Sequence, residues 1–280
     1  MILVFGKTGQ VATELQLQAD VTALDRHAAD LSDPASCAAA IREHRPDVVI
    51  NAAAYTAVDR AEEEPDLAQM INAQAPAAMA QACADLGIPF LHVSTDYVFD
   101  GSGTDPWQVN DPIAPLSVYG RTKAAGEEAV REAGGAYAIL RTSWVFSAHG
   151  NNFVKTMLRL SETRDALSVV DDQIGGPTPA AGIAAALLDM ARAMRTGQSG
   201  GTYHYAGTPS TSWKCFARET FAAAGRKVDV TGIPTCDYPT PATRPLNSRL
   251  DCSALESDFG ISPPIWKANL AQIVRKLLLL

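Results

Sequence analysis

The sequence predicts an α/β protein in which a doubly wound parallel sheet of the Rossmann type carries a smaller, interleaved C-terminal lobe. Short apolar runs alternate with longer helical patterns through the first half of the 280 residues, as in parallel strands joined by helices. A glycine-rich turn, VFGKTGQVATEL, follows the first apolar run, where dinucleotide-binding sheets have their phosphate-binding turn. After about residue 148 the alternation loosens and proline and glycine become frequent, which indicates a second lobe.

The expected elements of the sheet follow one another in regular order. The predicted strands are 2–5, 21–24, 47–52, 89–94 and 137–142. The predicted helices lie near 10–19, 34–44, 65–86 and 119–133. Ser32 or Asp33 is expected to cap the second helix, with Pro34 in its first turn. Each strand is thus followed by a helix, so ligands should bind at the carboxyl ends of the strands.

The second half predicts an interleaved chain. A strand candidate at 167–171 and an alanine-rich helix at 180–195 are expected to return to the first sheet before the chain leaves it again. The dinucleotide-binding domain would then comprise residues 1–148 and about 167–200. The substrate-binding lobe would comprise about 149–166 and 201–280.

Composition excludes several classes of function. The net charge of −8 and the pI near 5.1 argue against a nucleic-acid partner, which needs a basic surface. The chain has no apolar run of about 20 residues, so no membrane partner is expected. Its five cysteines form no C-x-x-C pair and its histidines lack ligand spacing, so we predict no metal site and no disulfide framework. A reducing cytoplasm fits this cysteine usage.

The glycine turn has the spacing G-x-x-G-x-x-A, formed by Gly6, Gly9 and Ala12. A Walker A loop would need a glycine five residues before Gly6, where the sequence has Met1. A dinucleotide turn remains, because Gly6 permits a tight turn, Gly9 lets the backbone approach a pyrophosphate, and Ala12 is small enough for helix packing. The pattern alone is equally consistent with a plain strand-to-helix turn.

Residues at the ends of the next strands favour the cofactor interpretation. Asp25 ends the second strand, where an acid can bond the adenosine ribose, and the adjacent Arg26 could instead meet a 2′-phosphate. The sequence therefore supports NADPH or NADH without separating them. Ala52, Ala53 and Ala54 leave room for a cofactor, although small residues also serve close helix packing. The fourth strand ends in the hydroxyl-rich stretch STDY, at the edge where ligands bind.

Tyr119 and Lys123 lie four residues apart in PLSVYGRTK, so they share one face of a helix. Such a pair can supply a proton to a substrate, or it can be a surface tyrosine lying along a lysine stem. If the pair is catalytic, the Lys123 ammonium is expected to lower the pKa of the phenol.

Several longer strings resemble a known family. GKTGQVATEL, NAAAYTAVD, STDYVFDG, YGRTK and RTSWVF together resemble the extended short-chain dehydrogenase/reductases, and within them the dTDP-4-dehydrorhamnose reductase family. The resemblance continues through NNFVKTML, DDQIGGPT and TPATRPLNSRLD, so it spans nearly the whole chain. It implies NAD(P)H-dependent reduction of the C4 ketone of a dTDP-linked keto sugar, dTDP-4-dehydro-L-rhamnose, in the supply of cell-surface polysaccharide precursors.

The resemblance implies a catalytic set of Thr95, Tyr119 and Lys123, with Tyr119 as the proton donor. Lys123 and Tyr119 would also contact the cofactor. The other cofactor-binding residues that it implies are Gly6, Gly9, Gln10, Val11, Asp25, Arg26, Asp30, Leu31, Ala53, Ala54, Tyr55 and Thr56. The substrate-binding residues would be Thr95, Asp96, Tyr119, Trp144, Arg244 and Arg249, the two arginines meeting the phosphates of dTDP.

The assembly expected is a monomer or a weak homodimer. Some family members dimerise through magnesium held by acidic side chains, and Glu14 matches one of these acids. Its partner acid would fall near residue 181, which is Ala181 here, so a metal-bridged dimer is not expected.

Two alternative functions remain open from the sequence. A related branch includes the regulatory subunit of methionine adenosyltransferase, which binds NADP and a partner enzyme without catalysis, and RPLNSRLDCSALE resembles that branch. A reductase or epimerase for another keto sugar is the second, although epimerisation needs a further acid/base pair that the sequence does not reveal.

Overall fold

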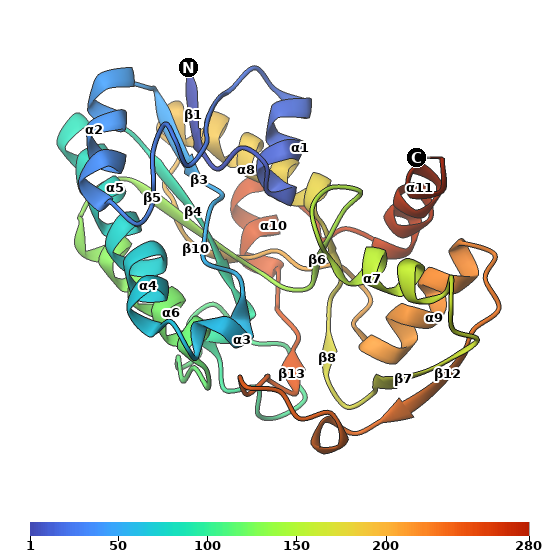
Figure 1. Ribbon diagram of the computed structural model, residues 1–280. Helices are drawn as coiled ribbons and strands as arrows, with labels where there is room; N and C mark the ends of the chain where they lie inside the picture. The colour runs from blue at the N-terminus through green and yellow to red at the C-terminus, as the bar shows by residue number, and fades with distance from the viewer. Residues whose placement is uncertain (280) are drawn as a thin grey trace.

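The computed structural model describes residues 1–279, and its largest element is a six-stranded parallel sheet (Figure 1). The strand order is β10-β5-β4-β3-β1-β2. The strands are β1 (Ile2–Phe5), β2 (Thr22–Leu24), β3 (Val48–Asn51), β4 (Phe90–Thr95), β5 (Tyr137–Thr142) and β10 (Gly201–His204). The predicted fold class is confirmed, and the first five strands lie within a residue or two of their predicted positions.

The four predicted helices join these strands, together with one short helix at residues 58–61 that the sequence did not predict. They are α1 (Gln10–Gln18), α2 (Pro34–His44), α3 (Val58–Ala61), α4 (Pro65–Gln69), α5 (Ala75–Leu86) and α6 (Val118–Glu132). A π-helical segment, Met70–Gln74, joins α4 to α5, so the predicted helix at 65–86 is one continuous element with a wider turn inside it. Of the two candidate caps of α2, Asp33 is the one whose side chain accepts the Ser36 N–H.

Helices cover both faces of the sheet, as its apolar strands require (Figure 1). On one face, Leu15 of α1 and Leu187 of α8 (Ala180–Arg195) belong to one buried cluster. On the other face, Ile41 of α2, Met79 of α5 and Val130 of α6 belong to a second. These two layers hold the sheet rigidly between them.

One predicted strand lies elsewhere, and one strand was missed. The predicted strand at 167–171 does not return to the main sheet, because β7 (Ala166–Val170) pairs with β12 (Asp229–Ile233) in the smaller lobe. The sixth strand of the main sheet is β10, which follows α8 and pairs with β5. Residues 201–204 were expected in the smaller lobe instead. The alanine-rich helix does return, since α8 packs against α1. The division of the chain into two domains with these boundaries stays a prediction.

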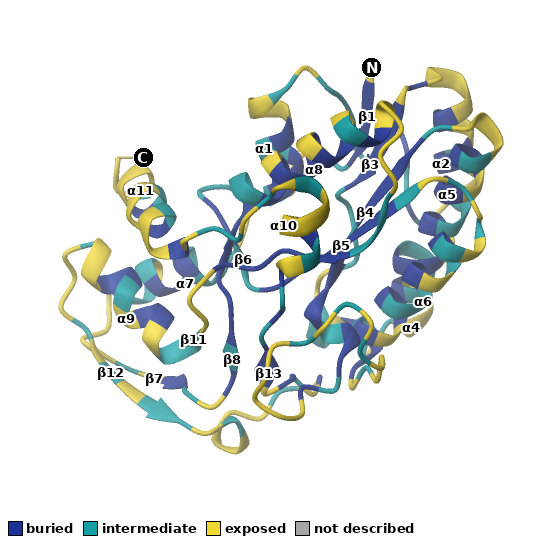
Figure 2. Ribbon diagram, turned by 180° about the vertical axis from the view of Figure 1, so that it is seen from behind, coloured by how far each residue is buried: buried dark blue, intermediate teal, exposed yellow. Residues whose placement is uncertain are grey.

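The smaller lobe surrounds an aromatic core that includes Phe146, Phe216 and Trp266. Figure 2 shows buried stretches, in dark blue, within this lobe and exposed ones, in yellow, on its outside. Its helices are α7 (Phe153–Leu160), α9 (Trp213–Ala223) and α11 (Trp266–Leu278). The remaining elements are the short strands β6 (Val145–Phe146), β8 (Ile174–Gly175), β9 (Thr178–Pro179), β11 (Thr211–Ser212) and β13 (Asn247–Ser248), helix α10 (Ser253–Phe259), and the 3₁₀ turns Asp96–Val98 and Thr235–Asp237. Within residues 1–279, no helix has both the length and the apolar character to span a membrane.

The strand order reverses between β1 and β3, because β2 lies on one side of β1 and the later strands lie on the other. Loops from the two halves of the sheet diverge at such a switch point and leave a crevice at the carboxyl ends of the strands. The topology therefore predicts where a ligand binds before any side chain is considered.

Helix α6 packs unusually close to the π-helical segment. A Cβ atom at Gly126 would lie 2.1 Å from the Asn72 carbonyl oxygen. The Asn72 side chain in turn donates to Thr122 Oγ1 at 3.1 Å, one turn earlier on α6. This approach, which only glycine permits, sets the distance of α6 from the sheet.

We predict that Gly126→Ala destabilises the protein by about 3 kcal/mol, because the added methyl group must push two backbones apart. Gly182→Ala in α8 is the matched control, since the only atom that its Cβ would approach more closely than 3.4 Å is the hydroxyl at the far end of the Tyr205 side chain. The free energy of unfolding in urea measures both. An equal effect of the two substitutions would contradict the close packing of α6.

Candidate active site

A cleft of about 760 Å³ lies over the carboxyl ends of β1, β3, β4 and β5, at the predicted switch point. The predicted site residues that line it are Gly6, Gly9, Gln10, Val11, Asp25, Arg26, Asp30, Leu31, Ala53, Ala54, Thr56, Thr95, Asp96, Tyr119, Lys123 and Trp144. The structure therefore brings most of the predicted set together. Tyr55, Arg244 and Arg249 are not among the residues that line the cleft.

The glycine turn joins β1 to α1. Gly6 has a φ of +103°, and a Cβ there would lie 3.4 Å from the Cβ atoms of Ala12 and Ala53. Gly9 caps α1 without a side-chain hydrogen bond, and no atom lies within 4 Å of where its Cβ would be. The first amides of α1 are thus free of a side-chain cap and accessible, which suits a pyrophosphate.

The end of β2 carries two acids and an arginine at the rim of the cleft. Asp25 accepts the backbone N–H groups of Ala28 and His27, and these bonds, with that of Ala28 largest, lower its pKa. Arg26 pairs with Asp30 at 3.0 Å, but its side chain is 76% exposed. The guanidinium is therefore free to turn toward a ligand at little cost, because an exposed ion pair stabilises weakly.

The loop after β3 presents its alanines to the cleft and turns Tyr55 away. The Tyr55 N–H donates to the Asn72 side chain at 2.8 Å, and its hydroxyl donates to Glu64 at 2.5 Å. The Tyr55 side chain thus helps to attach this loop to the helical segment behind it.

Thr95 and Tyr119 meet at the floor of the cleft. The Thr95 hydroxyl donates to Asp96 Oδ1 at 3.1 Å. Tyr119 lies in the first turn of α6, where Ser117 caps the helix by accepting the Gly120 N–H. Burial raises the pKa of Tyr119 to about 12, with the Thr95 hydroxyl lowering it and the Asp96 carboxylate raising it. The pKa of this phenol therefore lies above its ordinary value, opposite to the expected lowering by Lys123, which is not among the groups that shift it.

Lys123 is 1% exposed, and its amine donates to the Val93 carbonyl at 2.7 Å. It also lies 3.1 Å from His92 Nε2, an interaction between residues whose sequence spacing gives no sign of contact. Burial lowers the pKa of Lys123 to about 8, although the charge of Glu127 opposes this shift. The one sequence signal for His92 was a polar residue inside an otherwise apolar strand.

Asp96 is a buried carboxyl group whose hydrogen bonds are incomplete. Its Oδ2 atom and the hydroxyl of Thr142 are buried without a partner among residues 1–279. Burial raises the pKa of Asp96 to about 6, and the nearby Ser248 and Thr95 hydroxyls oppose the shift. Unpaired polar atoms beside a cleft suit a ligand rich in hydroxyl groups.

Trp144 forms the wall of the cleft toward the smaller lobe. It has a φ of +49°, which is strained for a bulky residue, and its ring stacks on Trp213 at 3.6 Å with an interplanar angle of 12°. Gly175 lies behind it, where a Cβ would approach Trp144 Cε2 to 2.8 Å. Trp213 and Gly175 were missed as supporting residues because their sequence spacing from Trp144 gives no sign of contact.

The two predicted phosphate ligands have other partners in this structure. Arg244 pairs with Asp59 at 2.7 Å, and Arg249 donates to Asn247 Oδ1 at 2.9 Å. Their role toward phosphates stays a prediction.

The comparisons with known proteins agree over the whole chain. The model of the RmlD substrate binding domain family matches residues 1–279. A dTDP-4-dehydrorhamnose reductase from Sinorhizobium fredii is 45% identical and covers 99% of this chain and 98% of its own, and one from Salmonella typhimurium is 43% identical, covering 99% and 97%. The chain belongs to the dTDP-4-dehydrorhamnose reductase family.

Solved structures of this reductase family have the same fold. The Clostridium acetobutylicum protein has a TM-score of 0.92 at 38% identity, covering 99% of both chains. The Bacillus anthracis reductase, in complex with NADP, has a TM-score of 0.92 at 35% identity, covering 98% of both. A Thermus thermophilus UDP-glucose 4-epimerase, at 20% identity and a TM-score of 0.80, shows the fold alone. These names favour a reductase over the regulatory-subunit and epimerase alternatives.

We predict that Gly175→Ala displaces the Trp144 indole, because the new methyl group would occupy space that the ring now fills. Near-ultraviolet circular dichroism should show loss of the signal of the stacked Trp144–Trp213 pair, as in Trp213→Phe. Gly182→Ala, which adds a methyl group outside this reductase cleft, should keep the signal. An unchanged spectrum in Gly175→Ala would rule out the tight fit.

We predict that Asp96→Asn stabilises the protein at neutral pH. Because the folded-state pKa of Asp96 lies above its ordinary value of 3.8, the group costs stability as pH rises from about 4 through about 6. A rise from 3.8 to about 6 corresponds to about 3 kcal/mol. Urea unfolding at about pH 4 and about pH 7 should show a gain for the variant only at the higher pH. An equal gain at both would contradict the raised pKa.

Proposed function

We propose that this chain is an NADPH-dependent reductase that converts dTDP-4-dehydro-L-rhamnose to dTDP-L-rhamnose. The observation that carries the proposal is that Thr95, Tyr119 and Lys123 line the same cleft as the glycine turn between β1 and α1. The names of the full-length relatives supply the substrate, and the NADP complex of the Bacillus anthracis reductase supports the choice of cofactor.

The residues present fit a dinucleotide cofactor. The uncapped first turn of α1 and the open space at Gly9 would receive the pyrophosphate. Asp25 would accept a ribose hydroxyl, and the exposed Arg26 would turn toward a 2′-phosphate, which favours NADPH. Ala53 and Ala54 would let the rest of the cofactor lie against the backbone. When bound, NADPH supplies the hydride.

Tyr119 is the proposed proton donor to the oxygen of the reduced ketone. With a pKa raised to about 12, the phenol is fully protonated at neutral pH, so it carries the proton that the developing alkoxide needs. Thr95, which hydrogen-bonds Asp96, would orient the substrate oxygen toward this phenol. Lys123 would direct an N–H group to the nicotinamide ribose.

Asp96 and Trp144 are proposed to hold the sugar. The unpaired Oδ2 atom of Asp96 would accept a sugar hydroxyl, and the indole offers an apolar face to the deoxysugar ring. Arg244 and Arg249 are proposed to meet the diphosphate. Arg244 would then exchange at least part of its pairing with Asp59 for phosphate oxygens.

We also propose a cytoplasmic protein that is a monomer or a weak homodimer. Its five cysteines are free, three of them buried, which suits a reducing compartment. Glu14 lies 3.2 Å from His149, and the only side-chain atom of Ala181 is a methyl carbon, which argues against a shared magnesium site.

We predict that Tyr119→Phe lowers the rate of NADPH oxidation with dTDP-4-dehydro-L-rhamnose by about a hundredfold or more, because the proton donor is lost. NADPH binding, measured by fluorescence titration, should stay within about threefold of wild type, since the ring is retained. Tyr137→Phe is the matched control, because that tyrosine is the first residue of β5 and so lies at the amino ends of the strands, opposite the cleft. Folded wild type that binds NADPH but shows no turnover would contradict the proposed function.

A further inference from the structure

His204, the last residue of β10, is a fully buried histidine that does not line the cleft. Its Nδ1 atom lies 3.0 Å from the Trp107 carbonyl oxygen, and its Nε2 atom lies 3.3 Å from Arg141 Nη1. A carbonyl oxygen can only accept a hydrogen bond, and a guanidinium group can only donate one. The neutral imidazole therefore carries its proton on Nδ1, donates to Trp107 and accepts from Arg141.

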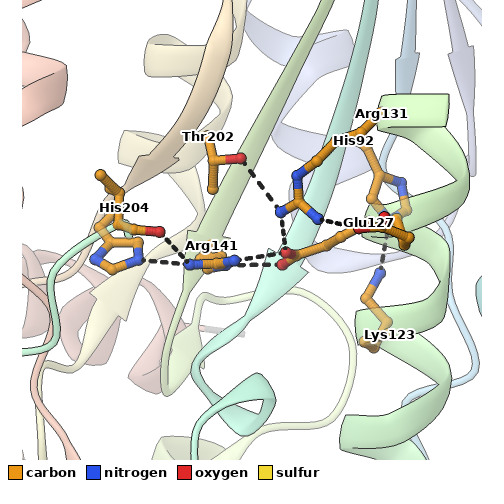
Figure 3. A network of polar contacts seen from close by, with 9 residues as sticks. His92, Lys123, Glu127, Arg131, Arg141, Thr202 and His204 are labelled. Carbon is orange, nitrogen blue, oxygen red and sulfur yellow. Dashed lines mark hydrogen bonds and ion pairs between the residues drawn. The ribbon is translucent and has the colours of Figure 1, made fainter. Parts of the chain in front are cut away.

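The Arg141 guanidinium fixes the other side of this ring. It binds the two carboxylate oxygens of Glu127 on α6 at 2.8 and 2.7 Å, and Figure 3 shows it between His204 and Glu127. Burial lowers the pKa of His204 to about 4, and the positive charge of Arg141 adds to the shift. The imidazole is therefore neutral at neutral pH, and its one donor is directed at Trp107.

Trp107 belongs to residues 101–109, an irregular segment that we call the strap. The strap lies between the 3₁₀ turn after β4 and helix α6. Two of its carbonyl groups hold it to the sheet. The carbonyl of Trp107 accepts from His204, and that of Val109 accepts from Arg141 at 3.1 Å. The strap is thus attached to the ends of β5 and β10.

The other edge of the strap pairs with residues 247–251. The Trp107 N–H donates to the Arg249 carbonyl, and the Asp251 N–H donates to the Trp107 carbonyl, both at 2.9 Å. The Trp107 indole N–H donates to the Asn247 carbonyl at 3.1 Å. The Trp107 carbonyl oxygen thus accepts from the buried imidazole and from residues 247–251 at once, and it joins this segment to the sheet.

Residues 247–251 lie behind the two side chains that are proposed to hold the sugar. The Ser248 hydroxyl lies near the Asp96 carboxyl group, where it opposes the rise in pKa that burial causes. A Cβ atom at Gly175 would lie 2.8 Å from Trp144 Cε2 and 3.0 Å from Ser248 Cβ, so Ser248 packs beside the glycine that supports the indole. A shift of this segment would therefore disturb both sugar contacts.

We infer that His204 is a positioning residue for the sugar side of the cleft, because its bond to the Trp107 carbonyl holds residues 247–251 behind Asp96 and Trp144. The inference rests on the proposed function, which assigns the sugar to those two side chains. Three strands separate β10 from β1, which leads into the glycine turn. Loss of the bond should therefore weaken binding of the nucleotide sugar far more than binding of NADPH.

Two substitutions of His204 separate its two hydrogen bonds. In His204→Asn the side-chain amide nitrogen is as many bonds from the backbone as Nδ1, so it can still donate to Trp107. In His204→Gln the amide oxygen is as many bonds away as Nε2, so it can accept from Arg141 while Trp107 loses its donor. Both variants remove the ring, so a loss of packing alone should affect them alike.

We expect His204→Gln to raise the KM for dTDP-4-dehydro-L-rhamnose about tenfold, the usual effect of losing one buried hydrogen bond. Its kcat and its Kd for NADPH should stay within about threefold of wild type, and His204→Asn should restore the KM to within about threefold. Urea unfolding of both variants measures their loss of stability. The same rise in KM in both variants, or a matching loss of NADPH affinity, would overturn the inference.

Amide hydrogen exchange in the full-length wild-type protein gives a test without any variant. Adding dTDP-L-rhamnose to the protein with NADPH should slow exchange of the Trp107 and Asp251 amides by about threefold or more, because a bound sugar holds the segment against the strap. NADPH alone should leave both rates unchanged. Binding of dTDP-L-rhamnose without this protection would overturn the inference, whereas failure of the nucleotide sugar to bind would instead contradict the proposed function.

Discussion

The close approach of α6 to the π-helical segment is the constraint on which the proposed active site depends. Gly126 brings the helix against the Asn72 carbonyl, and Asn72 also binds the loop after β3. One residue thus sets the positions of both α6, which carries Tyr119 and Lys123, and the alanine loop that lines the cleft. The wider π turn places the Asn72 side chain between them.

Burial is what gives the side chains of the cleft their chemistry. The same desolvation raises the pKa values of Tyr119 and Asp96 and lowers that of Lys123, so all three are shifted toward their neutral forms. With pKa values of about 6 and about 8, Asp96 and Lys123 can change protonation state near neutral pH, whereas Tyr119 stays protonated. Fixed carboxylate charge in the interior is confined mainly to Glu127, where two arginines match it.

The smaller lobe contributes to the cleft through the shape of its packed aromatic side chains rather than through charge. Trp213 and Gly175 hold Trp144 in a strained backbone conformation against the cleft, and Trp213 also contacts the aromatic core around Phe216. A rigid indole held in this way resists reorganisation when a ligand binds. The strain at Trp144 therefore has a structural support that extends through the lobe.

The sequence by itself determined the parallel sheet, its first five strands and the residues of the glycine turn, because those features depend on local periodicity and on backbone freedom at particular residues. It also placed Tyr119 and Lys123 on one face of α6, since that follows from helix geometry. Only the tertiary structure decided that the sixth strand is β10 and that Trp213 supports Trp144. Pairings between distant segments leave no local pattern, and the same holds for the contact of Lys123 with His92, which lies 31 residues away.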